Sequence, residues 1–154
     1  MNILYDNFLE KRGLTKEFLE KINDNSHKDL KDIDKVAEIL HDIYLSGEKI
    51  VVLPDFDMDG IASSVVGFSG LAELGFNVSL YKRDPNLGYE FGKKDIDIIT
   101  DLYPGVKTII TCDVGISCYD AISYAKDLGL TVLVTDHHKE NPKTKDKMAA
   151  DVVI

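Results

Sequence analysis

Residues 49–60 read KIVVLPDFDMDG, an apolar run that leads directly into three aspartates spaced two residues apart. The apolar run at 50–53 predicts a short buried β-strand. Gly60 lets the backbone turn tightly into a following helix, whose N-terminus favours a phosphate. In an extended segment alternate side chains share one face about 7 Å apart, so two such carboxylates can hold two neighbouring cations. The stretch therefore predicts a strand, a cation-binding loop and a helix.

The same order of strand, loop and helix recurs along the rest of the chain. Predicted helices follow the aspartates as far as Leu74 and span about 93–102 and 117–128, the last with an S-x-x-D start signal at Ser117 and Asp120. The further apolar runs that predict strands lie at 78–81, 108–111, 131–134 and 152–154. Near-continuous apolar strands between amphipathic helices predict an α/β fold, a parallel sheet with helices on both faces and right-handed crossovers.

Residues 1–47 lack strand-like runs and read as helical. Thr15 can cap a first helix, which the polar run 23–26 ends, and a second helix follows from about Asp34. The apolar residues at helical spacing are Phe18, Leu19 and Ile22 in the first helix and Val36, Ile39, Leu40, Ile43 and Tyr44 in the second. We therefore expect a helical segment, 1–47, that packs on an α/β domain, 48–154.

The chain has 154 residues, 44% of them apolar and 29% charged, which suits one globular domain of ordinary size. It has no apolar run of the roughly twenty residues that a membrane span needs, and its N-terminus lacks the regions of a signal peptide. These features predict a cytoplasmic protein that does not bind membranes. Cys112 and Cys118 match neither a disulfide framework nor a zinc pattern, so we expect reduced, mostly buried thiols.

The formal net charge of −9 argues against non-specific adhesion to nucleic acid over the whole surface. Part of this charge belongs to the acidic motifs, where bound cations would neutralise it. A nucleic-acid substrate must therefore follow a basic path that is confined to one face.

Further acidic motifs follow two of the later predicted strands. Asp113 comes after the strand at 108–111, and Asp136-His137-His138 comes after the strand at 131–134. Because open α/β sheets bind ligands at the carboxyl ends of their strands, the three motifs should converge on one crevice. Carboxylate oxygens with one imidazole suit Mn²⁺ or Mg²⁺ better than a structural zinc, and the other imidazole can contact a phosphate.

Two ordinary interpretations compete with a metal site. An Asp-rich turn that caps a helix explains one of the aspartates at 55, 57 and 59 well and three poorly. An EF-hand loop needs a glutamate where position 66 is Val. A pair of cations about 3.5–4 Å apart, which activates a water and stabilises the oxygens of a phosphoryl displacement, accounts for the number of acids. Without cations, the carboxylates would repel each other and raise each other's pKa values.

Together these residues resemble the DHH phosphoesterase superfamily, in which D-x-D-x-D-G is followed by D-x-G and then by V-T-D-H-H. Within that superfamily the chain is most similar to the RecJ single-stranded DNA exonucleases. The similarity extends beyond the motifs to KRGL at 11–14, FL at 18–19, IDKVA at 33–37, GEKI at 47–50 and LGY at 87–89. It implies a two-metal phosphodiesterase that uses Mn²⁺ or Mg²⁺ and releases nucleotides from the 5′ end of single-stranded DNA.

The resemblance also implies a role for each residue of the motifs. The metal ligands that it implies are Asp57, Asp59, Asp113 and His137, with Asp113 bridging two ions. The catalytic residues around them would be Asp55, Asp136 and His138. Asp55 would be a further ligand or a carboxylate just outside the ligands, Asp136 would orient a histidine, and His138 would contact the scissile phosphate.

Basic and aromatic residues near the crevice are less specific candidates for contacts with DNA. Lys82 and Arg83 follow the second strand and could reach the phosphates, and so could Tyr89 and Lys139. Further lysines that could line a strand path are Lys93, Lys94, Lys143, Lys145 and Lys147. Taken singly, each lysine is better explained as a solvated surface residue. Phe56, Tyr89 and Phe91 could stack on bases, although core packing explains Phe56 at least as well.

The chain departs from the RecJ pattern at its C-terminus. The RecJ pattern continues with a fourth motif that supplies one more metal-binding aspartate, and then with a second domain that helps to grip the substrate. This sequence ends at 154, before either of them. We therefore expect either a fragment or a minimal form that a partner chain or dimerisation completes.

Other functions compete with the exonuclease interpretation. Within the superfamily, short oligonucleotides or cyclic dinucleotides are alternative substrates, while a manganese pyrophosphatase would have His in place of Asp55. A non-catalytic subunit of a replication or repair assembly would keep the fold with degenerate motifs. The first three motifs are intact here, which disfavours this alternative, while the missing fourth motif leaves it open. A receiver-like signalling domain has no use for His137-His138.

Overall fold

The computed structural model describes residues 30–88, 90–140 and 145–154. Residues 31–154 form one compact unit, and the following description concerns that unit. The helix that the sequence predicts after Thr15, with Phe18, Leu19 and Ile22 on one face, lies outside the described residues. Among the residues that are described, no helix is both long and apolar enough to cross a lipid bilayer.

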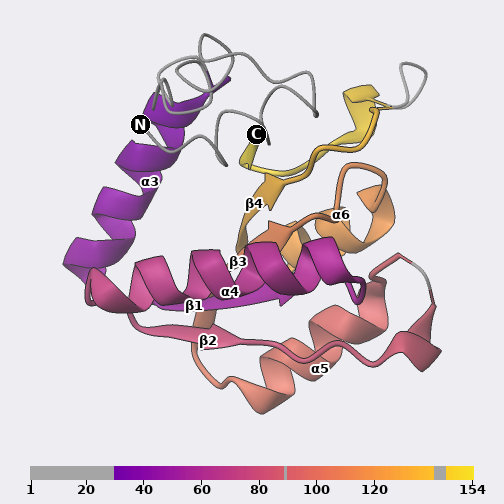
Figure 1. Cartoon of the computed structure of the whole chain (residues 1–154), viewed down its shortest axis with the longest axis horizontal. Coiled ribbons are helices and arrows are strands. Elements are labelled where there is room, and N and C mark those ends of the chain that lie inside the picture. Colours follow the sequence, from indigo (N-terminus) through magenta and orange to yellow (C-terminus); the bar gives the residue numbers. More distant parts are fainter. Residues whose placement is uncertain (1–29, 89, 141–144) are drawn as a thin grey trace, which may run out of the picture. The chain divides into compact units, whose positions relative to one another are not determined.

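The centre of the unit is a parallel sheet of five strands in the order β2-β1-β3-β4-β5 (Figure 1). The strands are β1 (Lys49–Pro54), β2 (Val78–Leu80), β3 (Val106–Cys112), β4 (Thr131–Thr135) and β5 (Val152–Val153). Most of β1 and the middle of β4 are buried without alternation, because helices cover both faces of the sheet. The predicted strands and the predicted α/β class are confirmed.

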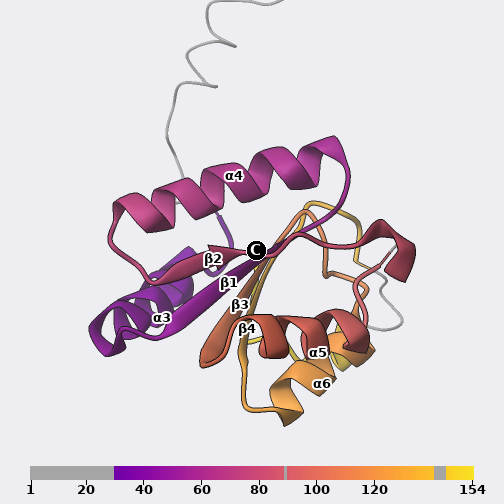
Figure 2. The same ribbon diagram turned by 90° about the horizontal axis from the view of Figure 1, so that it is seen from below.

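Helices cover both faces of the sheet, as the sequence predicts (Figure 2). They are α3 (Ile33–Ser46), α4 (Met58–Glu73), α5 (Lys93–Leu102) and α6 (Tyr119–Asp127), with short 3₁₀ turns η2 (Pro85–Leu87) and η3 (Lys145–Lys147). The chain steps from β1 to β2 in one direction, and from β2 to β3 and β4 in the other. Because parallel crossovers are right-handed, this reversal places α4 on one face and α5 and α6 on the opposite face.

Two apolar layers join the helices to the sheet. In the first layer α5 and α6 pack on β1 and β3, and its buried residues include Ile96, Ile99, Ile122, Val51, Leu53 and Ile109. In the second layer α3 packs on β4 and β5 through Val36, Ile39, Leu40, Leu133 and Val152. Each fully buried side chain of this size contributes roughly 1.5–3 kcal/mol to folding. The helical spacing of apolar residues therefore predicted the buried side of α3 correctly at Val36, Ile39, Leu40 and Ile43. It was wrong for Tyr44, which is 54% exposed and contacts the Phe76 ring.

The start of α6 differs from the prediction. Cys118 is the N-cap and makes no side-chain capping hydrogen bond. The Ser117 hydroxyl donates instead to Glu90 Oε1 at 2.7 Å, so it links the loop before α6 to the segment before α5. The S-x-x-D signal was therefore wrong by one to two residues, because a tertiary partner competes for the serine. Cys112 and Cys118 are free and buried, as expected.

Candidate metal centre

The carboxyl ends of β1, β3 and β4 lie side by side at one edge of the sheet. The register pairs Pro54 with Cys112, and Cys112 with Thr135. An aspartate follows each of these three residues, and the backbone ladder continues into them: Asp55 N donates to Cys112 O at 3.0 Å, and Asp113 N donates to Thr135 O at 2.9 Å. The strand order reverses between β1 and β3, the position where open α/β sheets bind ligands. The three motifs therefore meet at one place, as predicted.

Asp113 adopts a left-handed backbone conformation, with a φ of 63°, directly after β3. This conformation is uncommon for a residue with a side chain and costs about 1 kcal/mol, although Asp tolerates it better than most. The turn then depends on Gly115, whose φ is 127° and where an added Cβ would lie 3.0 Å from the Thr111 hydroxyl and 3.1 Å from Val134. The glycine of the D-x-G motif is therefore needed for the sharp bend that follows Asp113.

The Asp113 carboxylate is buried, and its Oδ1 has no hydrogen-bond donor among the residues that the structure describes. Burial raises the pKa of this carboxyl, His137 and His138 lower it, and Asp57 and Asp59 raise it. His137, His138, Asp57 and Asp59 thus all lie close enough to Asp113 to change the pKa of its carboxyl. A buried carboxylate oxygen without a donor is the state that a bound cation would satisfy.

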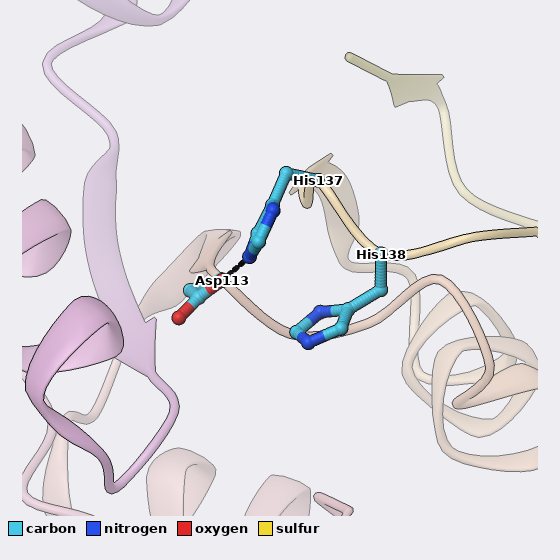
Figure 3. A group of neighbouring side chains, drawn as sticks. All are labelled: Asp113, His137 and His138. Carbon is cyan, nitrogen blue, oxygen red and sulfur yellow. Dashed lines mark ion pairs between the residues drawn. The ribbon is translucent and has the colours of Figure 1, made fainter.

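His137 and His138 complete a compact group with Asp113 (Figure 3). His137 Nε2 lies 3.0 Å from Asp113 Oδ1, and the pair does not have the alignment of a hydrogen bond. One ligand atom from each of the three residues lies within 4.8 Å of the other two. Two ligands at right angles in an octahedron with bonds of about 2.1 Å lie about 3 Å apart. The Asp113–His137 pair therefore fits a hard divalent cation.

Asp136 connects the loop after β4 to the loop after β3. Its Oδ2 accepts a hydrogen bond from Ile116 N at 2.9 Å, and its Oδ1 accepts one from His138 N at 3.0 Å. The same Oδ1 lies 2.7 Å from His138 Nδ1. This hydrogen bond, and then the charge of Asp136, raises the pKa of His138. Asp136 thus makes the contact with a histidine that the sequence led us to expect, while the catalytic roles stay predictions.

We expect Asp136→Asn to lower the pKa of His138 in the metal-free protein, because it removes the charge that faces Nδ1. The raised pKa means that the pair stabilises the folded protein below the ordinary pKa of histidine, and that this contribution is lost as the pH rises through the raised value. An NMR titration in EDTA measures the shift, with the exposed His41 on α3 as an internal reference. An unchanged titration of His138 in the variant would show that Asp136 does not control the imidazole.

The aspartates of the first motif, at positions 55, 57 and 59, lie in different places between the end of β1 and the first turn of α4. Asp57 is the N-cap of α4, and its Oδ1 accepts a hydrogen bond from Gly60 N at 3.0 Å. Asp59 is exposed in the first turn of α4 and lines a cavity of about 380 Å³ together with Asp113 and His137. Helix capping therefore explains one oxygen of Asp57, and the first turn of a helix suits the negative charge of Asp59. A cation shared by the two residues stays a prediction.

Asp55 and Arg83 form a buried ion pair beside the centre. Arg83 Nη1 lies 3.3 Å from Asp55 Oδ1, and the two side chains are only 1% and 6% exposed. The sequence suggested Arg83 as a phosphate contact, but protein groups surround its guanidinium. The segment after β2 runs beside the end of β1, where a buried carboxylate needs a counter-charge. Contact between Arg83 and a substrate stays an untested prediction.

Other predicted substrate contacts are spread around the crevice. Lys139 is exposed and lines a cavity of about 180 Å³ with Asp55, Asp113 and His138. Lys82 is exposed and lines an apolar groove along α4 that Asp55 and Arg83 also line. Phe91 is 3% exposed and packs in the core, so its ring is not available to stack on a base. Tyr89 and Lys143 lie outside the described residues, and the exposed lysines of the strand path are Lys93, Lys94 and Lys147.

Three residues near the centre were not singled out from the sequence. Ser63 lines the cavity of about 380 Å³, and Glu90 lines that of about 180 Å³. Asp95 is fully buried and lies 3.7 Å from Arg83 Nε. The sequence does contain a signal for Asp95, because an acid at the third position of a helix commonly accepts a hydrogen bond from the backbone N–H of the N-cap residue. In α5, Asp95 Oδ2 accepts such a bond from Gly92 N. No local pattern marks Glu90.

The chain has relatives among known proteins. Residues 49–153 match the sequence model described as DHH family, N-terminal domain. The Salmonella typhimurium protein named single-stranded-DNA-specific exonuclease RecJ is 34% identical over 109 residues, which are 71% of this chain and 19% of that protein. The Bacillus subtilis protein of the same name is 32% identical over 122 residues, 79% of this chain and 15% of its own length. The chain therefore spans about a fifth or less of the length of these relatives.

Two crystal structures share the fold. Exonuclease RecJ bound to manganese matches with a TM-score of 0.68 and 26% identity, over 80% of this chain and 31% of that one. RecJ from Thermus thermophilus in complex with Mn²⁺ matches with a TM-score of 0.63 and 23% identity, over 80% and 17%. The resemblance that the order of motifs predicted is confirmed. The chain belongs to the DHH family, whose N-terminal domain it matches over residues 49–153.

Proposed function

We propose that this chain carries the cation-binding part of a metal-dependent phosphodiesterase that acts on single-stranded DNA. The observation that carries the proposal is the Asp113–His137 pair, two ligand atoms 3.0 Å apart at the switch point of the sheet. The names of the relatives support the substrate class, and manganese in a matching crystal structure supports the metal. Release from the 5′ end rests on the resemblance to RecJ, and a cytoplasmic location rests on the sequence alone.

The residues that would hold two Mn²⁺ or Mg²⁺ ions are Asp57, Asp59, Asp113 and His137. Bound there, the ions would activate a water and neutralise the phosphate oxygens. Asp113 suits the position of a ligand shared by two ions, because His137, Asp57 and Asp59 all lie close enough to affect the pKa of its carboxyl.

His138 would contact the scissile phosphate. Its ring is exposed beside the cavity of about 180 Å³, and the Asp136 contact holds Nδ1. Because Asp136 raises the pKa of His138, the imidazole keeps its positive charge to a higher pH and attracts an anionic phosphate. Asp136 would thus set both the orientation and the charge of His138, and Lys139 adds a cation at the rim of the same cavity.

The test is hydrolysis of 5′-labelled single-stranded DNA, a dinucleotide and pyrophosphate by the full chain, with Mn²⁺ and with EDTA. We expect Mn²⁺-dependent release of nucleotides from DNA, and none with EDTA or with His137→Ala. Asp127→Asn, which changes an exposed acid in α6, is the matched control and should keep the activity. Cleavage of the dinucleotide alone would favour the short-oligonucleotide alternative. No hydrolysis of any substrate, together with no Mn²⁺ binding by calorimetry, would exclude an enzymatic role for this chain.

A further inference from the structure

A buried network of charged side chains adjoins Asp55, and Arg83 is its centre. Besides the Asp55 contact, Arg83 Nε lies 3.7 Å from Asp95 Oδ1, and Nη2 donates to Gly88 O at 2.8 Å. The Arg83 and Asp95 side chains are 1% and 0% exposed. Because arginine does not lose its proton in a protein, a buried guanidinium requires anions and carbonyl groups around it. The network supplies both.

Asp95 gives Arg83 a fixed partner. Its Oδ2 accepts from Gly92 N at 2.9 Å at the start of α5, and its Oδ1 accepts from the Tyr81 hydroxyl at 3.2 Å. Burial, and then the charge of Asp95, raises the pKa of Tyr81 to about 12, so the phenol remains a donor at neutral pH. Asp95 is therefore held both by α5 and by the residue that follows β2.

The other end of the network fixes one oxygen of Asp55. In addition to Arg83, the Phe56 N–H donates to Asp55 Oδ1 at 2.8 Å. The Phe56 ring centroid lies 5.6 Å from the guanidinium carbon of Arg83. The Asp55 carboxylate also lines the cavity of about 180 Å³ together with Asp113 and His138. Protein groups thus hold one oxygen of Asp55, and the residue borders the candidate centre.

We propose that Arg83 is a positioning residue of the metal centre, which holds Asp55 in place at its edge and is itself held by Asp95. This inference rests on the proposed cation-binding function and extends it into the protein interior. Arg83 has two effects of opposite sign on a cation in the crevice. Its charge repels the cation, whereas its hydrogen bonds keep Asp55 oriented. The sign of the change in Mn²⁺ affinity therefore reports which effect dominates.

Arg83→Lys separates the two effects, because it keeps the charge while one ammonium group cannot serve Asp55, Asp95 and the Gly88 carbonyl together. We expect Mn²⁺ binding by the full chain, measured by calorimetry, to weaken about 10- to 100-fold, as for other residues that orient metal ligands. Arg83→Met, which removes the charge as well, should also weaken it. Unchanged affinity in Arg83→Lys, or tighter binding in Arg83→Met, would overturn the proposal.

A double-mutant cycle tests whether Arg83 acts through Asp55. Asp55→Asn should weaken Mn²⁺ binding, and the addition of Arg83→Lys to that variant should weaken it only about threefold or less, because the two residues act as one unit. A general loss of structure would not produce this dependence on Asp55. If the double variant loses Mn²⁺ affinity by the full product of the two single losses, Arg83 does not act through Asp55, and the proposal fails.

Controls separate this proposal from folding and from the proposed function. Lys107→Gln removes an exposed cation near the opposite end of β3 and should bind Mn²⁺ like the wild type. Circular dichroism in EDTA checks the fold. If Arg83→Lys does not fold, Tyr81→Phe removes only the hydroxyl that bonds Asp95 and should weaken Mn²⁺ binding about two- to tenfold; unchanged binding would then count against the proposal. Failure of the wild type to bind Mn²⁺ would contradict the proposed function itself.

Discussion

Asp113→Asn is expected to abolish Mn²⁺-dependent hydrolysis, with a loss of at least about a thousandfold. Bound cations supply several kcal/mol of charge stabilisation in phosphoryl displacement, and about 1.4 kcal/mol corresponds to a factor of ten. The Asp113 carboxylate lies beside His137 and close enough to Asp57 and Asp59 for their charges to affect its pKa. An asparagine amide cannot replace its negative charge. Rates on labelled single-stranded DNA and calorimetric Mn²⁺ titration measure the loss. Asp127→Asn again controls for the removal of one acid.

The same variant is expected to be at least as stable as the wild type in EDTA. Because burial raises the pKa of Asp113, the wild type loses stability as the pH rises from the ordinary carboxyl pKa through the raised value. Asparagine removes this penalty and tolerates the left-handed conformation of the position. Thermal unfolding at neutral pH in EDTA, and again with Mn²⁺, is the measurement. A lower midpoint in EDTA, or a Mn²⁺-induced rise equal to that of the wild type, would contradict the assigned role.

Gly60→Ala is expected to lower the free energy of unfolding by about 1–3 kcal/mol and to weaken Mn²⁺ binding. A Cβ at Gly60 would lie 2.6 Å from the carbonyl oxygen of Asp55 and 2.7 Å from its Cβ. Neither atom belongs to the flexible end of a side chain, so the end of β1 or the start of α4 must move. Because Asp57 caps α4 through Gly60 N, such a movement displaces two aspartates of the motif at once. Chemical denaturation and calorimetry measure the two effects.

Gly70→Ala in the same helix is the matched control for this substitution. No atom lies within 4 Å of a Cβ added at Gly70. Since alanine favours a helix more than glycine does, we expect Gly70→Ala to raise stability by up to about 1 kcal/mol. If Gly60→Ala is as stable as Gly70→Ala, α4 does not pack on the end of β1 as closely as the structure shows.

The sheet, and the place where the carboxyl ends of its strands meet, were predictable from the sequence because the apolar runs and acidic motifs that mark them are local. Most of β1 and the middle of β4 are apolar on both faces, which marks them as buried, and α5 spans the residues predicted for it, Lys93–Leu102. The convergence of Asp55, Asp113 and Asp136 follows from one general property of parallel sheets, that ligand sites lie at the carboxyl ends of strands. A motif after each of three strands was therefore enough to predict a common site.

Contacts between distant segments were not predictable from the sequence. Arg83 was a candidate for a phosphate contact, because no local pattern shows that the segment after β2 runs beside the end of β1. Ser117 carried a capping signal, but Glu90, distant in sequence, takes its hydroxyl. Phe91 was a candidate for stacking on a base, and this prediction was wrong because the packing around the ring places it in the core. In each case a tertiary partner competed with the local pattern.

The central claim is that the ends of β1, β3 and β4 form one site for two divalent cations. Anomalous diffraction from crystals of the chain grown with saturating Mn²⁺ tests it most directly. The expected result is two peaks about 3.5–4 Å apart, with the Asp113 carboxylate between them and His137 Nε2 against one of them. Crystals with no Mn²⁺ peak at these residues, or with Mn²⁺ bound only elsewhere on the chain, would contradict the claim.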